Sequence, residues 1–157
     1  MLAKLQARVL ELLGHQTTAT ASDRDDGIQL ATATLMAEVA QADGQFTDDA
    51  RQALESLLTT RFSLSPDDCA TIVASGVASA EQAVSLQGFT RSLHEALDDQ
   101  EKSKIVGMLW QVAAADGDID ANEDARIAQI GELLYVPRSI VLKLKAEAGA
   151  DIGRGSA

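Results

Sequence analysis

One helix-turn-helix phrase occurs twice in the chain, and this duplication limits the possible folds more than any other feature. The copies are AEVAQADGQFTDDARQALESLL at residues 37–58 and WQVAAADGDIDANEDARIAQIGELL at residues 110–134. Subtracting the number of Asp43 from that of its counterpart Asp116 gives an offset of 73, at which the apolar positions of both copies coincide. The repeat predicts two related helix pairs, near residues 27–64 and 99–137, arranged about a pseudo-twofold axis.

The spacing of apolar residues predicts an all-α fold. Five aromatic residues and few β-branched runs leave little material for strands, whereas helical periodicity recurs along the chain. Thr47, Ser65 and Asp120 precede apolar stretches as helix N-caps, and Asp98 opens a capping box. A length of 157 residues is typical of one domain. We therefore expect a single domain of seven or eight helices over residues 27–149.

The two ends of the chain are expected to lie outside this core. Residues 1–14, MLAKLQARVLELLG, predict a separable amphipathic helix, and the polar residues 15–26 predict a linker. The first core helix is expected to begin at Asp26 or Gly27, and residues 150–157 predict a disordered tail. No stretch reaches the roughly 20 apolar residues that a membrane span requires. Direct membrane insertion is therefore not expected.

Charge and cysteine content exclude some partners. A net charge of -11 and a pI near 4.4 argue against nucleic acid as a partner, because binding phosphates requires clustered Lys and Arg. The single cysteine, Cys69, cannot form an intramolecular disulfide, which favours a reducing compartment and a cytoplasmic location. A protein partner or a homo-oligomer remains open.

The carboxylates of the repeated phrase are the candidate functional residues. Asp43 and Asp116 each follow an apolar helix, where the helix dipole is negative, and duplication would bring the two together. Such a pair needs a cation, a proton or a basic side chain between its members. All-oxygen ligands favour Ca²⁺, Mg²⁺ or Mn²⁺ over Zn²⁺. The predicted divalent-cation site comprises Asp43, Asp116, Asp120, Glu123 and Asp49.

Several motifs together are similar to a known family. The doubled Ala-Asp-Gly frame, MLWQVAAADGDID and LLYVP resemble the TerB-like tellurite-resistance family, in particular its small stand-alone cytoplasmic members, over roughly residues 27–146. The resemblance implies an all-helical fold with internal pseudosymmetry, an acidic metal site and a role in a bacterial stress response. The family's acidic signature falls on Asp43, Asp116 and Glu123. Ala50 stands where the second copy has Glu123, which argues against two symmetric ions.

Alternative interpretations of the same residues remain open. Asp120 and Glu123 also form a helix capping box, and Arg91 or Arg126 could neutralise the aspartates in place of a metal. The loop that begins at Asp116 is not an EF-hand, because its twelfth position is isoleucine. No His or Lys pattern predicts an enzyme. The two hypotheses are a divalent-cation-binding or sensing domain and a metal-free helical interaction module.

Overall fold

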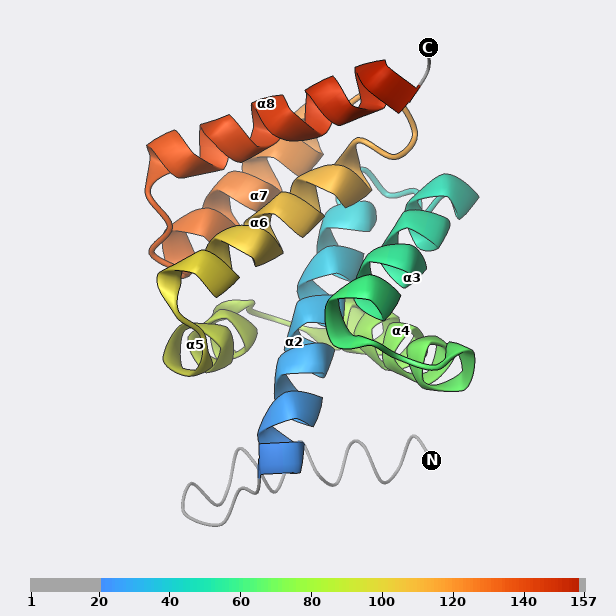
Figure 1. Cartoon of the computed structure of the whole chain (residues 1–157), viewed down its shortest axis with the longest axis vertical. Helices are drawn as coiled ribbons and strands as arrows, with labels where there is room; N and C mark the ends of the chain where they lie inside the picture. Colours follow the sequence, from blue (N-terminus) through green and yellow to red (C-terminus); the bar gives the residue numbers. More distant parts are fainter. Residues whose placement is uncertain (1–20, 156–157) are drawn as a thin grey trace.

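The computed structural model describes the backbone of residues 21–155 and the side chains of residues 24–149. These residues form seven helices and no strand, as the sequence predicts (Figure 1). The predicted helix at residues 1–14 lies outside the described residues. No helix within residues 21–155 combines the length and the apolar character needed to cross a membrane. The helices are α2 (Ala21–Ala40), α3 (Asp48–Phe62), α4 (Pro66–Gln82), α5 (Gln87–Ala96), α6 (Asp99–Ala113), α7 (Ala121–Leu133) and α8 (Arg138–Gly155).

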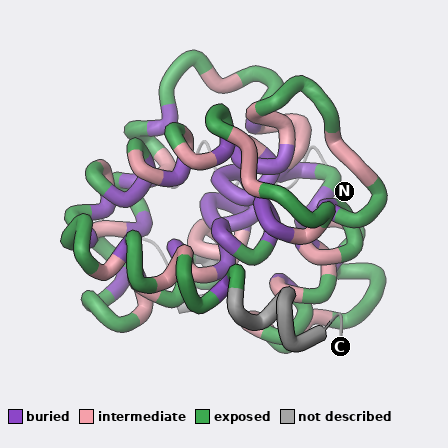
Figure 2. Tube along the Cα trace, turned by 90° about the horizontal axis from the view of Figure 1, so that it is seen from above, coloured by how far each residue is buried: buried purple, intermediate pink, exposed green. Residues whose placement is uncertain are grey.

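Helix α2 lies at the centre of the molecule. It packs against α3, α4, α5, α6 and α7, and between Leu30 and Ala40 only Glu38 is not fully buried (Figure 2). Two buried hydroxyls on this helix are satisfied locally, because Thr32 donates to the carbonyl of Ile28 and Thr34 to that of Leu30. A helix that is apolar on all sides is a core helix, and the other elements cover it.

Two predicted boundaries are wrong. Helix α2 begins at Ala21, so residues 21–26 are helical rather than part of a linker. Their polarity does not oppose a helix, because Arg24 and Asp25 are exposed and acids are favourable near a helix N-terminus. Helix α8 continues to Gly155 instead of ending near Gly149, so residues 150–155 are not a disordered tail. Gly149 and Gly153 lie inside this helix, and a helix tolerates each glycine at a cost of about 1 kcal/mol.

The capping signals in the sequence are confirmed. The hydroxyl of Thr47 accepts from the amide of Ala50 at 3.1 Å, and Ser65 accepts from the amide of Asp68 at 3.2 Å. Helices α6 and α7 each begin with a complete capping box, in which two side chains and two backbone amides pair reciprocally. The starts of α3, α4, α6 and α7 therefore follow from local sequence.

The two Ala-Asp-Gly turns share one backbone structure. Each has a glycine with positive φ, 85° at Gly44 and 115° at Gly117, a conformation that glycine adopts without steric cost. The backbone hydrogen bonds of the first turn have counterparts 73 residues later in the second turn. Superposition of the complete helix pairs stays a prediction. The first turn has Ala42 N to Val39 O (3.1 Å) and Gly44 N to Gln41 O (2.9 Å), and the second has Ala115 N to Val112 O (3.2 Å) and Gly117 N to Ala114 O (3.1 Å).

Helices α2 and α4 cross at a glycine. A Cβ atom placed on Gly76 would lie 2.8 Å from both the carbonyl carbon and the Cβ of Ala33. Backbone atoms cannot move aside as a flexible side chain can, so this crossing requires the absence of a side chain at position 76.

Gly76→Ala is expected to lower the free energy of unfolding by about 1 to 3 kcal/mol, because overpacking must separate α2 from α4. Chemical denaturation monitored by circular dichroism measures the change. Gly88→Ala is the matched control, since a Cβ on Gly88 meets no atom within 4 Å. Equal effects of the two substitutions would show that the α2–α4 crossing is not the constraint.

Candidate metal centre

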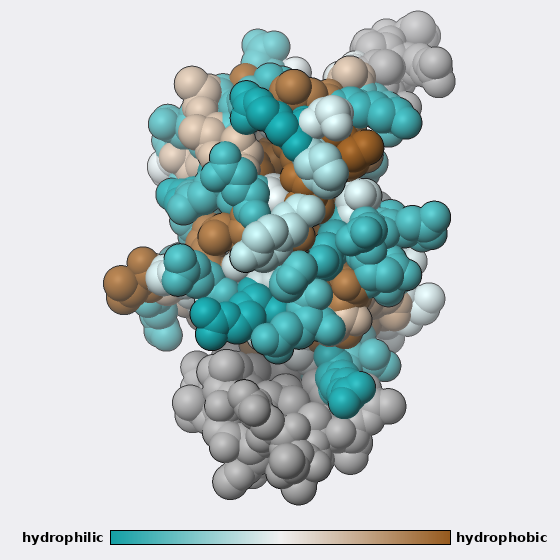
Figure 3. All heavy atoms as spheres, turned by 90° about the vertical axis from the view of Figure 1, so that its left-hand side faces the viewer, coloured by the Kyte–Doolittle hydropathy of each residue, from teal (hydrophilic) through white to brown (hydrophobic). Residues whose placement is uncertain are grey.

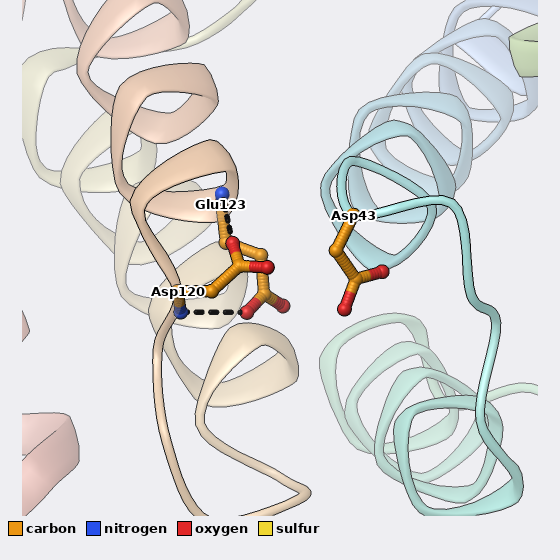
Figure 4. A group of neighbouring side chains, drawn as sticks. All are labelled: Asp43, Asp120 and Glu123. Atoms are coloured by element: carbon orange, nitrogen blue, oxygen red, sulfur yellow. Dashed lines mark hydrogen bonds between the residues drawn. The ribbon is translucent and has the colours of Figure 1, made fainter.

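Three carboxylates from the two halves of the chain lie together. Asp43 follows α2 in the first Ala-Asp-Gly turn, Asp120 is the N-cap of α7, and Glu123 lies in the first turn of α7. One oxygen from each lies within 4.8 Å of the other two, and the side chains point into the same space (Figure 4). We call Asp43, Asp120 and Glu123 the acid triad.

Backbone amides hold each member of the acid triad. The amide of Gln45 donates to Asp43 Oδ1 at 3.0 Å, and that of Glu123 donates to Asp120 Oδ1 at 2.8 Å. The amide of Asp120 in turn donates to Glu123 Oε1 at 3.1 Å. Within the described residues, the second oxygen of each carboxylate makes no hydrogen bond. The local turns thus orient the three side chains and leave one oxygen of each available to a ligand.

Glu123 is the electrostatically strained member. It is 5% exposed, and its pKa rises from 4.5 to about 7. The largest cause is burial, which disfavours the charged carboxylate, and the negative charges of Asp120, Asp116 and Asp43 add to it. The hydrogen bond from the Asp120 amide acts in the opposite direction. The acid triad therefore favours a proton or a cation at Glu123.

The arginines considered from the sequence do not pair with the acid triad. The guanidinium of Arg126 lies 3.5 Å from a carboxylate oxygen of Glu38 and donates to Gln129 at 3.1 Å. Arg91 is exposed on α5 and forms no ion pair with the described residues. Across residues 24–149, no Lys, Arg or His forms an ion pair with a triad member. Compensation by a basic side chain is thus the least supported of the three possibilities.

Two of the predicted ligands stand apart from this group. Asp116 is exposed and is not among the three mutually close carboxylates, although its charge contributes to the raised pKa of Glu123. Asp49 is exposed in the first turn of α3 and is likewise outside the group. A direct role for Asp116 or Asp49 as a ligand stays a prediction.

The corresponding positions of the first repeat are not acidic. At the offset of 73, Thr47 corresponds to Asp120 and Ala50 to Glu123. Thr47 keeps the N-cap hydrogen bond of its counterpart, and Ala50 is buried like Glu123. The described structure therefore concentrates carboxylates in one cluster rather than two.

Sequence reasoning missed Glu38, whose ion pair with Arg126 joins α2 to α7. The two residues belong to different repeats, and no spacing rule connects them. The one available signal is a charged residue within the otherwise apolar run of α2.

A comparison with models of protein families finds a match over most of the chain. The family model described as "Tellurite resistance protein TerB" matches residues 29–146, which is most of the chain and includes the whole acid triad. No curated protein and no solved structure matches the chain significantly.

In the presence of chelator, the free energy of unfolding is expected to fall as the pH rises from about 4.5 to about 7. The folded protein retains the proton on Glu123 to higher pH than the unfolded chain, so the stabilisation is complete below the lower value and lost above the upper one. One pKa unit corresponds to about 1.4 kcal/mol, so the rise from 4.5 to about 7 corresponds to a change of about 3 kcal/mol.

Urea denaturation at a series of pH values measures this dependence, and Glu123→Gln should remove it. Glu132→Gln on the exposed side of the same helix is the control and should retain it. Parallel profiles for the wild-type protein and Glu123→Gln would contradict the assignment to Glu123.

Proposed function

We propose that this chain, which belongs to the tellurite resistance protein TerB family, binds or senses a divalent cation through its acid triad in a bacterial stress response. One observation carries the proposal. Carboxylates from two separate parts of the chain converge within 4.8 Å, and the described residues supply no basic partner for them. A cation between Asp43 and α7 would relieve this repulsion and join the two halves.

The ligand chemistry favours a hard ion. All three groups are carboxylates, which suit Ca²⁺, Mg²⁺ and Mn²⁺, whereas structural Zn²⁺ sites use nitrogen and sulfur. Ligands on opposite sides of Ca²⁺ lie roughly 5 Å apart, since each Ca–O distance is about 2.3 to 2.6 Å. The acid triad, whose oxygens lie within 4.8 Å of one another, is compatible with this value. Ca²⁺, Mg²⁺ and Mn²⁺ are therefore the candidate ions.

We further propose that the chain acts by binding rather than catalysis, in the cytoplasm. Within the part of the chain described, no His or Lys forms an ion pair with the acid triad, and none is therefore placed there as a general acid or base. Cys69 is buried and free, which agrees with a reducing compartment.

Water and exposed carboxylates such as Asp116 would complete the coordination of the ion.

The metal-free interaction module is the second candidate. It is favoured by the raised pKa of Glu123, because a proton at that site neutralises part of the acid triad without any metal. The acidic surface would then serve to attract a basic protein partner. The two candidates differ in whether a divalent ion stabilises the fold.

Addition of Ca²⁺ or Mn²⁺ to chelator-treated protein is expected to raise the melting temperature. At a hundredfold excess over Kd, binding to the folded state alone contributes about 2.7 kcal/mol. Asp43→Asn and Glu123→Gln should abolish this response, because each removes one ligand charge and keeps an oxygen that can accept the backbone hydrogen bond. Without metal, both variants should be at least as stable as the wild-type protein, since repulsion is reduced.

Asp118→Asn is the matched control, because it removes a charge from an exposed position of the second turn and should leave the response intact. Asp116→Asn and Asp49→Asn test the wider predicted site, and a loss as large as that of Asp43→Asn would make either residue a ligand. The absence of any metal-dependent shift in the wild-type protein would reject the cation site and leave the interaction module.

A further inference from the structure

The acid triad lies on two structural elements that an ion pair joins. Asp43 belongs to the turn that follows α2, whereas Asp120 and Glu123 belong to the start of α7. Glu38 in the last turn of α2 and Arg126 in the second turn of α7 approach each other, with 3.5 Å between Glu38 Oε1 and Arg126 Nη2. The ion pair and the acid triad therefore connect the same two elements.

Both partners of this ion pair lie close in sequence to the acid triad. Arg126 follows Glu123 by three residues, and residues three apart lie on the same side of a helix. Glu38 precedes the turn that contains Asp43. It interrupts the buried stretch of residues 30–40, and 21% of its side chain is exposed. Since α2 packs against α7, the Glu38 carboxylate lies at the edge of the interface between these helices.

Two electrostatic forces act between these elements in opposite directions. The carboxylate of Asp43 and the carboxylates of α7 repel one another, because like charges lie close together without a cation. The attraction between Glu38 and Arg126 opposes this repulsion across the same interface. Other interhelical ion pairs among the described residues join α3 to α6 and α8 to α7, so they do not act between α2 and α7.

We propose that Glu38 and Arg126 are positioning residues of the acid triad. Their ion pair holds the turn after α2 against the start of α7 and keeps Asp43 close to Asp120 and Glu123. For cation binding, this inference rests on the function proposed above. An ion that arrives then finds its ligands in place, and preorganisation of this kind raises affinity without any contact between the ion and the positioning residues.

The effect of position is separable from the effect of charge. A carboxylate near the site attracts a cation and a guanidinium repels it, so charge alone predicts that Glu38→Gln weakens binding and that Arg126→Gln strengthens it. In the double variant these two effects oppose each other, and the net charge stays at -11. Loss of the ion pair, in contrast, remains in the double variant. A weaker affinity of the double variant is therefore the signature of a positioning role.

Calorimetric titration of the chelator-treated full chain with Ca²⁺ and with Mn²⁺ measures this affinity. The Kd of the double variant is expected to rise by about twofold to fivefold, the range that corresponds to loss of a partly exposed ion pair. A purely structural ion pair would lower the melting temperature of the metal-free protein and leave the Kd of the folded protein unchanged.

Two single variants are the controls and should keep the wild-type Kd. Glu132→Gln removes the same charge as Glu38→Gln from the exposed surface at the other end of α7. That end lies toward the side of the molecule drawn in Figure 3, where hydrophilic side chains surround separate apolar patches. Arg61→Gln removes an ion pair between α3 and α6, in which 3.8 Å separate Arg61 from Glu101.

A second measurement needs no metal and so separates this inference from the function proposed above. Gln45 and Asn122 are exposed, one in the turn after α2 and the other in the first turn of α7. Nitroxide labels on Gln45→Cys and Asn122→Cys, in a Cys69→Ser background, report the distance between the two elements by electron paramagnetic resonance. In chelator-treated protein, Glu38→Gln combined with Arg126→Gln should broaden the distribution toward longer distances.

The possible outcomes are distinct. An unchanged distance distribution in the double variant would overturn the inference, whether or not the protein binds a cation. So would a double variant that binds Ca²⁺ or Mn²⁺ as tightly as the wild-type protein. A broadened distribution in a chain that binds neither ion would reject the proposed cation site and support the positioning role alone.

Discussion

Burial of α2 is the constraint on which the rest of the structure depends. Five helices pack around it, which is possible because its buried stretch, residues 30–40, consists largely of alanine, threonine and a few larger apolar residues. The crossing with α4 is so close that a Cβ atom on Gly76 would overlap the backbone of Ala33. Small residues at a helix crossing allow close approach and extensive van der Waals contact. The position of α2 is therefore fixed along much of its length. The turn that follows its C-terminal end places Asp43 close to the start of α7.

The acid triad takes its geometry from interactions that would exist without any ligand. The capping box that begins α7 orients Asp120 and Glu123, and the turn after α2 orients Asp43. Helix capping stabilises α7 by about 1 kcal/mol per cap. The same arrangement buries Glu123 beside two other carboxylates and raises its pKa to about 7. One set of hydrogen bonds thus stabilises the helix start and holds Glu123 in a position where burial and neighbouring negative charges raise its pKa.

Local signals in the sequence predicted most of the fold, and tertiary packing determined what they missed. Thr47, Ser65 and the two capping boxes begin helices as predicted, because each cap depends on residues at most three positions away. The predictions were wrong for the start of α2 and the end of α8. Polar composition indicated loops in both segments, although exposed polar residues are compatible with a helix. Asp43, Asp120 and Glu123 were all predicted ligands. Their grouping without Asp116 depends on how α2 packs against α7, which periodicity does not encode.

Differences between the two copies of the repeated sequence limit the number of buried charges. Both halves need an N-cap after the Ala-Asp-Gly turn, and Thr47 meets this need with a neutral hydroxyl where the second half uses Asp120. Both halves also bury the residue three positions later, which is Ala50 in one and Glu123 in the other. A second buried glutamate at position 50 would require its own proton or cation, since burial of an uncompensated charge is strongly unfavourable. Neutral residues in the first half preserve the helix start and confine the electrostatic cost to the acid triad.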